Sequence, residues 1–96
     1  MVPLEIAEAI KFVKYFATDG MKTYPFDAVF KTTLEQIGWI EADIATLGHI
    51  RRETADRLVI GMMAAKELGN DEAEFAHALH VINGWAVDHA LPKNSA

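Results

Sequence analysis

Apolar residues recur at steps of three and four along almost the whole chain, which is the spacing of one face of an α-helix. In the first such stretch, residues 3–18, the apolar stripe consists of Ile6, Ala9, Ile10, Val13, Phe16 and Ala17. Pro3 suits the first turn of a helix, and the pair Asp19-Gly20 is expected to end it. We therefore predict a helix over residues 3–18 and a connector over residues 21–26.

A second helix is predicted over residues 27–47, and two residues compete to cap its start. Asp27 is a favourable N-cap residue, whereas Thr32 and Glu35 have the spacing of a capping box. The sequence leaves both starts open. The apolar seam of this helix comprises Phe30, Thr33, Ile37, Ile40, Ile44 and Leu47.

Gly48 separates this seam from a third helical stretch at about residues 50–68. Two arrangements are open here, a hairpin that turns at Gly48 or one continuous helix, because the same rhythm of apolar positions continues past the glycine. A continuous helix would bring Arg51 and Thr54 into the apolar seam. The hairpin is therefore favoured.

The fourth helix is predicted over residues 72–90, with Asp71 as its cap and Pro92 beyond its end. Its stripe consists of Phe75, Ala78, Leu79, Ile82, Trp85 and Ala86. Residues 93–96 form a polar tail. The fold class that follows is all-α: one domain over residues 1–92, a small bundle of about four helices with hairpin-type connections, completed by dimerisation.

The third helix carries more apolar side chains than one core-facing stripe needs. With Leu58, Met62 and Ala65 on an inward face, a second group of apolar residues points elsewhere, namely Val59, Ile60 and Met63. Either this helix is central to the bundle, or its second face meets another chain. We favour the second alternative, which predicts a homodimer.

Trp39 is the other apolar residue that departs from the pattern, because it falls opposite the seam, on the side of Gln36 and Asp43. Tryptophan is frequent among the residues that dominate protein–protein interfaces, so Trp39 could anchor a partner. Alternatively, the apolar residues of the connector, Met21, Tyr24 and Phe26, could cover it.

Composition limits the environment and the classes of function. Hydrophobic residues make up 51% of the 96 residues and charged residues 24%, which is typical of a globular domain. There is no cysteine, no signal-peptide pattern at the N-terminus and no apolar run near the ~20 residues that span a bilayer. We expect a soluble cytoplasmic protein that has no membrane partner.

The formal net charge of −5 argues against nucleic-acid binding, which usually depends on a basic face. The local basic cluster is Arg51, Arg52 and Arg57, which could begin a DNA-recognition helix after Gly48. Helical pairs four residues apart, Arg52 with Asp56 and Glu53 with Arg57, explain these residues more simply. A DNA-associated regulator is the second hypothesis, and nucleic acid is not an expected partner.

Metal binding and catalysis have little support. Glu74, His77 and His80 stand three residues apart on the fourth helix, but lie away from its apolar stripe and provide few ligands. A metal-binding bundle is therefore a third hypothesis, and no cofactor or metal is expected. The chain has no cysteine, one serine (Ser95) and no phosphate-binding loop, so no enzymatic activity is predicted.

Taken together, these features predict a non-enzymatic regulatory module that binds and modulates a protein partner, by sequestering or inhibiting it through helical surfaces. The residues predicted to form the interaction surface are Trp39, Val59, Ile60 and Met63.

Overall fold

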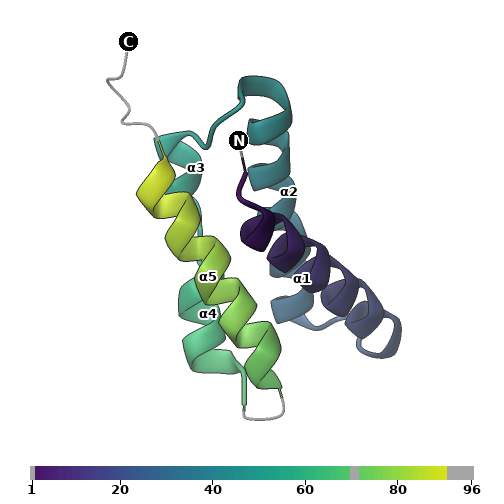
Figure 1. Ribbon diagram of the computed structural model, residues 1–96. Helices are drawn as coiled ribbons and strands as arrows, with labels where there is room; N and C mark the ends of the chain where they lie inside the picture. The colour runs from purple at the N-terminus through teal and green to yellow at the C-terminus, as the bar shows by residue number, and fades with distance from the viewer. Residues whose placement is uncertain (1, 70–71, 91–96) are drawn as a thin grey trace.

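The computed structural model describes residues 2–69 and 72–90, and these residues form a small all-α bundle. In chain order the helices are α1 (Leu4–Thr23), α2 (Ala28–Leu47), α3 (Arg52–Arg57), α4 (Ile60–Glu67) and α5 (Ala73–His89) (Figure 1). The predicted small all-α bundle is confirmed, with α3 and α4 in the place of the third of four expected helices, whereas its completion by dimerisation stays a prediction. The predicted cap Asp71 and the tail at 93–96 lie outside the described residues.

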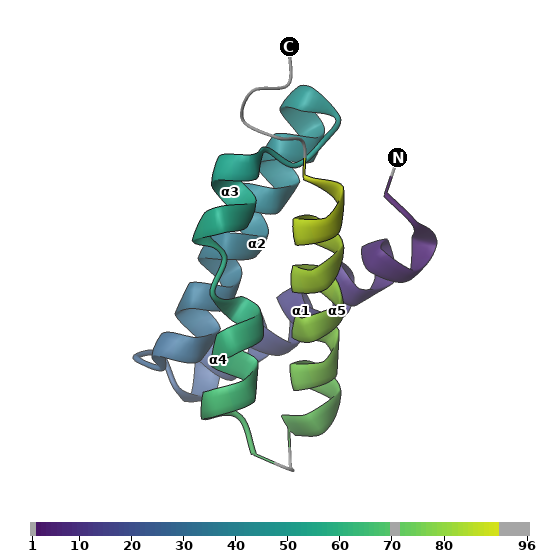
Figure 2. The same ribbon diagram turned by 90° about the vertical axis from the view of Figure 1, so that its left-hand side faces the viewer.

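The helices pack around α5. One side of α5 contacts α1 and another contacts α4, while α1 and α2 form an antiparallel hairpin. Figure 2 shows α3 and α4 following one another along the same side of the molecule, with α1 running obliquely behind α5. No helix among the described residues is long and apolar enough to cross a bilayer.

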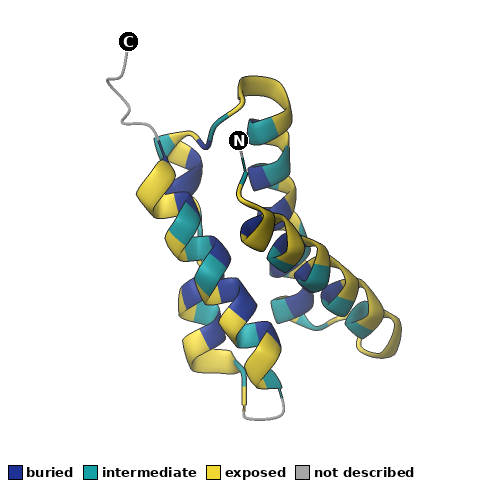
Figure 3. Ribbon diagram, in the orientation of Figure 1, coloured by how far each residue is buried: buried dark blue, intermediate teal, exposed yellow. Residues whose placement is uncertain are grey.

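The core consists largely of the predicted stripes (Figure 3). From α1, α2 and α5 the buried members are Ile6, Ile10, Val13, Ala17, Phe30, Thr33, Ile37, Ile40, Phe75, Ala78, Leu79, Ile82 and Ala86. The rings of Phe16 and Phe75 stack with their centroids 4.5 Å apart. The end of the α2 seam departs from the prediction, since Leu47 is 46% exposed.

The predicted end of the first helix at Asp19-Gly20 is wrong, because α1 continues to Thr23. Gly20 has a different use: a Cβ atom built on it would lie 2.5 Å from the Phe30 ring. The glycine therefore allows α1 and α2 to approach closely near their turn.

The predicted hairpin around Gly48 and the cap at Asp27 are confirmed. The Asp27 carboxylate accepts the backbone N–H groups of Val29 and Phe30 at 2.8 and 3.3 Å, so the helix does not start at Thr32. Gly48 ends α2 in the left-handed conformation, with φ 78°, where a side chain would be strained.

The third predicted helix is broken at Leu58 and Val59, where neither glycine nor proline is present. Leu58 is extended, and the Val59 N–H donates to the Gln36 side-chain oxygen at 2.8 Å instead of to a helical carbonyl. A hydrogen bond from α2 therefore replaces one that the helix loses at the break.

The break turns α4, and the predicted inward face of this stretch is consequently wrong. Ile60, Gly61 and Ala64 are buried, whereas Met62 and Ala65 are exposed. Periodicity carried across the break assigned Ile60, Met62 and Ala65 to the opposite sides.

Candidate protein-binding surface

The four residues predicted to bind a partner do not all lie on the surface. Ile60 is fully buried within the chain's own core, and Met63 is half-buried against that core. Val59 is 41% exposed and Trp39 is half-buried. Ile60 and Met63 thus complete this bundle, and the sequence argument for an outward apolar face holds only for Val59.

Trp39 lies opposite the apolar seam, as predicted, but that side of α2 is not a solvated face. Gln36 and Asp43 share the side and are both 4% exposed, because α3 and α4 pack there. The Arg57 guanidinium lies over the Trp39 ring, with Cζ 5.0 Å from the ring centroid. Trp39 is thus partly covered by an arginine of α3.

The residues expected to cover Trp39 from the connector do not act as a lid. Phe26 is 98% exposed and Tyr24 is 62% exposed, while Met21 belongs to α1 and packs against the core. The alternative in which the connector buries Trp39 is therefore wrong.

The next exposed side chains after Arg57 along the chain are both apolar. Val59 follows two residues later, and Met62, one helical turn further along α4, is 59% exposed. We call Trp39, Arg57, Val59 and Met62 the Trp39 surface. Met62 was missed because the sequence analysis assigned it to the inward face.

Asp43 fixes the turn that brings α3 to α2. Its carboxylate accepts the Arg51 backbone N–H at 3.1 Å and the Arg51 Nε–H at 3.0 Å. Burial alone would raise the pKa of Asp43, but hydrogen bonds from Thr54 and Arg51, together with the Arg51 charge, hold that pKa below its ordinary value of 3.8. The seven-residue spacing of Gln36 and Asp43 was the available signal that both lie on one side of α2.

The three arginines of the second hypothesis do not form a common basic face. Arg51 pairs with Asp43, the Arg52 Nη2 donates to the Ala90 carbonyl at 3.0 Å, and Arg57 lies on Trp39. The helix that they would begin, α3, has six residues. This geometry gives no recognition helix of the kind that enters a DNA groove.

The residues of the metal hypothesis are dispersed. Glu74, His77 and His80 are all exposed on α5, and no group of three or more potential ligands gathers within the described ranges. His89 stacks on Trp85 and places Nδ1 3.0 Å from the Trp85 carbonyl oxygen. These contacts account for His89 without a metal.

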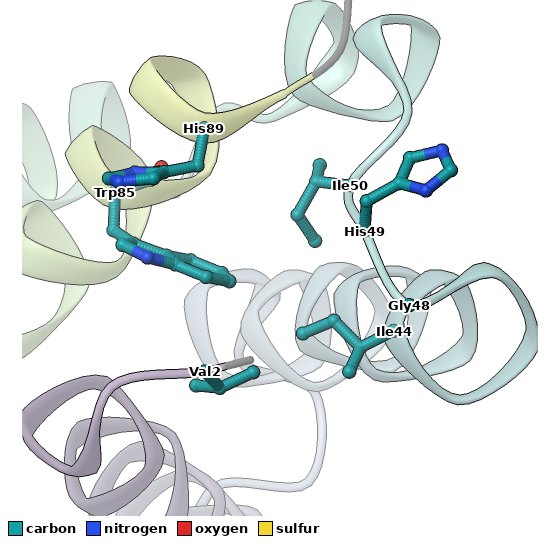
Figure 4. Close-up of a pocket in the computed structure, with 7 residues that line it drawn as sticks. All are labelled: Val2, Ile44, Gly48, His49, Ile50, Trp85 and His89. Carbon is teal, nitrogen blue, oxygen red and sulfur yellow. The ribbon is translucent and has the colours of Figure 1, made fainter.

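A pocket of about 190 Å³ opens between the N-terminal segment, the end of α2 and the end of α5 (Figure 4). Its apolar walls are Val2, Ile44, Ile50 and Trp85, and the His49 ring points away from it. The Trp85 Nε1 atom is buried and has no hydrogen-bond partner among the described residues. Gly48 and His89 complete the lining.

Comparison with known proteins gives one match. Residues 5–88 match the family model described as Tsi6, which covers the chain from the first turn of α1 to the last turn of α5. Searches of curated proteins and of solved structures give no match.

Proposed function

Because the chain belongs to the Tsi6 family, we propose that it is an immunity-type protein that binds a toxin and inhibits it through a helical surface. The family match is the observation that carries this proposal. It agrees with the interaction role predicted from the sequence, and the role needs no catalytic group, metal or cofactor on this chain.

We assign the toxin-binding role to the Trp39 surface. It combines tryptophan and arginine, two residue types that are enriched where binding energy concentrates, with the exposed apolar side chains of Val59 and Met62. A standard interface covers about 800 Å² of each partner. That area is roughly one eighth of the 6218 Å² of accessible surface on this chain, so one side of the bundle is large enough for such an interface.

The experiment produces this protein and the toxin in the same cell, because protection requires both proteins together. Cells that produce the toxin should survive when they co-produce this protein, and the purified pair should form a stable complex. Trp39→Ala should weaken the complex by about 2 kcal/mol, or about 30-fold in Kd. Tyr15→Ala is the matched control, since Tyr15 is 73% exposed on α1.

If the wild-type protein neither binds the toxin nor protects the cells, the proposed function is wrong. If Trp39→Ala and Tyr15→Ala bind equally well, the function holds and its assignment to the Trp39 surface fails.

We also propose the homodimer that was predicted from the sequence, but with a different set of residues at its interface. With Ile60 in the core, a second copy would have to dock on Val59 and Met62. Self-association and toxin binding would then compete for the same side chains, so adding the toxin should convert the dimer into a one-to-one complex. Sedimentation of the protein with and without the toxin tests this.

A further inference from the structure

Arg57 is held by an aromatic ring rather than by a carboxylate. It is the last residue of α3 and is exposed, and its guanidinium lies 5.0 Å from the Trp39 ring centroid. Glu53, four residues earlier, is the usual kind of helical partner for such a cation. Within residues 2–69 and 72–90, however, neither of the two ion pairs involves Arg57.

The contact between the guanidinium and the ring leaves N–H groups of Arg57 able to donate hydrogen bonds to a partner. Those donors lie in the plane of the group, in the fork that matches the two oxygens of a carboxylate. The ring also restricts the motion of a long side chain before any partner arrives. Less conformational entropy is then lost on binding.

The surroundings favour a protein carboxylate over a nucleic-acid phosphate. Phosphate binding draws its affinity from several cations acting together. Here the neighbouring Arg51 and Arg52 are engaged within the chain, and the next exposed side chains after Arg57 in the sequence, Val59 and Met62, are apolar. With a net charge of −5, the protein as a whole disfavours acidic groups, so an exposed cation that is held against a ring and has no carboxylate partner of its own among the described residues gives a partner carboxylate a preferred position.

We propose that Arg57 sets the register of the complex, by donating hydrogen bonds to an Asp or Glu side chain of the toxin while apolar toxin side chains cover Val59 and Met62. This inference rests on the proposed function, and it adds the chemistry of the partner's contact.

The test measures the Kd of the toxin complex by calorimetry for three single variants. Arg57→Ala should weaken binding about tenfold or more, and Arg57→Lys should not restore it, because lysine keeps the charge but lacks the planar fork. Lys66→Ala is the matched control: Lys66 is an exposed cation of α4, and its loss changes the net charge equally. It should leave Kd within about twofold. Circular dichroism checks that each variant is folded.

The partner carboxylate is then located by double-mutant cycles. Each Asp and Glu on the toxin surface is changed to its amide, and each variant is titrated against wild type and Arg57→Ala. One of the toxin substitutions should weaken binding to the wild-type protein but have little further effect on binding to Arg57→Ala, because the effects of substituting two contacting residues are not additive.

Three results would overturn the inference. In the first, Arg57→Ala binds the toxin as tightly as wild type. In the second, every toxin substitution is additive with Arg57→Ala, which means that no carboxylate meets Arg57. In the third, the wild-type protein is retained on RNA or DNA, whereas the Arg57→Ala variant is not. Failure of the proposed function is distinct, because then the wild-type protein itself does not bind the toxin.

Discussion

The side-chain oxygen of Gln36 accepts the backbone N–H of Val59 at 2.8 Å, and this bond joins the middle of α2 to the break between α3 and α4. Gln36 is 4% exposed, so water does not readily replace it. The position of the Val59 backbone against α2 therefore depends on a polar side chain in the bundle interior.

Gln36→Leu should destabilise the protein by about 1–3 kcal/mol, because it leaves a part-buried N–H without its acceptor. Urea unfolding followed by circular dichroism measures this. Glu35→Leu is the control, since Glu35 is exposed on the same turn of α2 and should change stability by less than about 0.5 kcal/mol. Equal effects of the two substitutions would contradict the assigned role of the hydrogen bond.

Gly20→Ala should destabilise the protein although alanine is the better helix former. The new Cβ would lie 2.5 Å from the Phe30 ring, and relieving that overlap typically costs about 1–3 kcal/mol. Gly84→Ala in α5 is the matched control, because a Cβ there meets no atom within 4 Å. It should stabilise the protein by up to about 1 kcal/mol. Thermal unfolding of both variants should show shifts of opposite sign.

Acid should destabilise the protein partly through Asp43. The pKa of this carboxyl is lower in the folded protein than its ordinary value of 3.8, so its contribution is fully present above about pH 4. It is lost as the pH falls through the lower folded pKa. Asp43→Asn should reduce stability at neutral pH by about 1.5–3 kcal/mol, the range for hydrogen bonds to a charged group.

Below pH 4 the difference between Asp43→Asn and wild type should narrow. Unfolding curves at pH 7 and pH 3 measure it, with Asp19→Asn, an exposed carboxylate of α1, as control. A constant difference across this range would show that Asp43 ionisation does not contribute.

Ile60→Asp should unfold the chain, because it places a charge at a fully buried position. Met62→Asp should leave the fold intact, since Met62 is 59% exposed. Circular dichroism separates these outcomes. The sequence analysis assigned Ile60 to an interface and Met62 to the core, so a folded Ile60→Asp variant would restore that assignment.

Features that depend on residues close together in the chain were predicted correctly, and features that depend on distant residues were not. Local signals were sufficient for the Asp27 cap, the Gly48 turn and the stripe from Phe75 to Ala86, since each depends on residues within a few positions. The break at Leu58 depends on Gln36, 22 residues earlier in the chain, and no pattern within the third helix contains it. Because the break changes the phase of α4, Ile60, Met62 and Ala65 were assigned to the wrong sides.

At the candidate surface, too, one feature follows from nearby residues and another depends on distant ones. The position of Trp39 opposite the seam could be predicted from periodicity within α2. Its contact with Arg57 could not, because it depends on how α3 crosses α2 after the Gly48 turn. Asp43 and Arg51 hold that crossing, and the sequence analysis treated the arginine as a member of a basic cluster.

The shortness of α3 and α4 affects how long the Trp39 surface stays assembled. Helices of six and eight residues do not persist alone, so both depend on their contacts with α2 and α5. Local opening of this segment should therefore cost less free energy than global unfolding, and its amide protons should exchange faster than those of α2. Trp39 belongs to the slowly exchanging helix, whereas Arg57, Val59 and Met62 belong to the segment that opens. A bound partner that contacts both would suppress this opening and slow the exchange of the amide protons of α3 and α4.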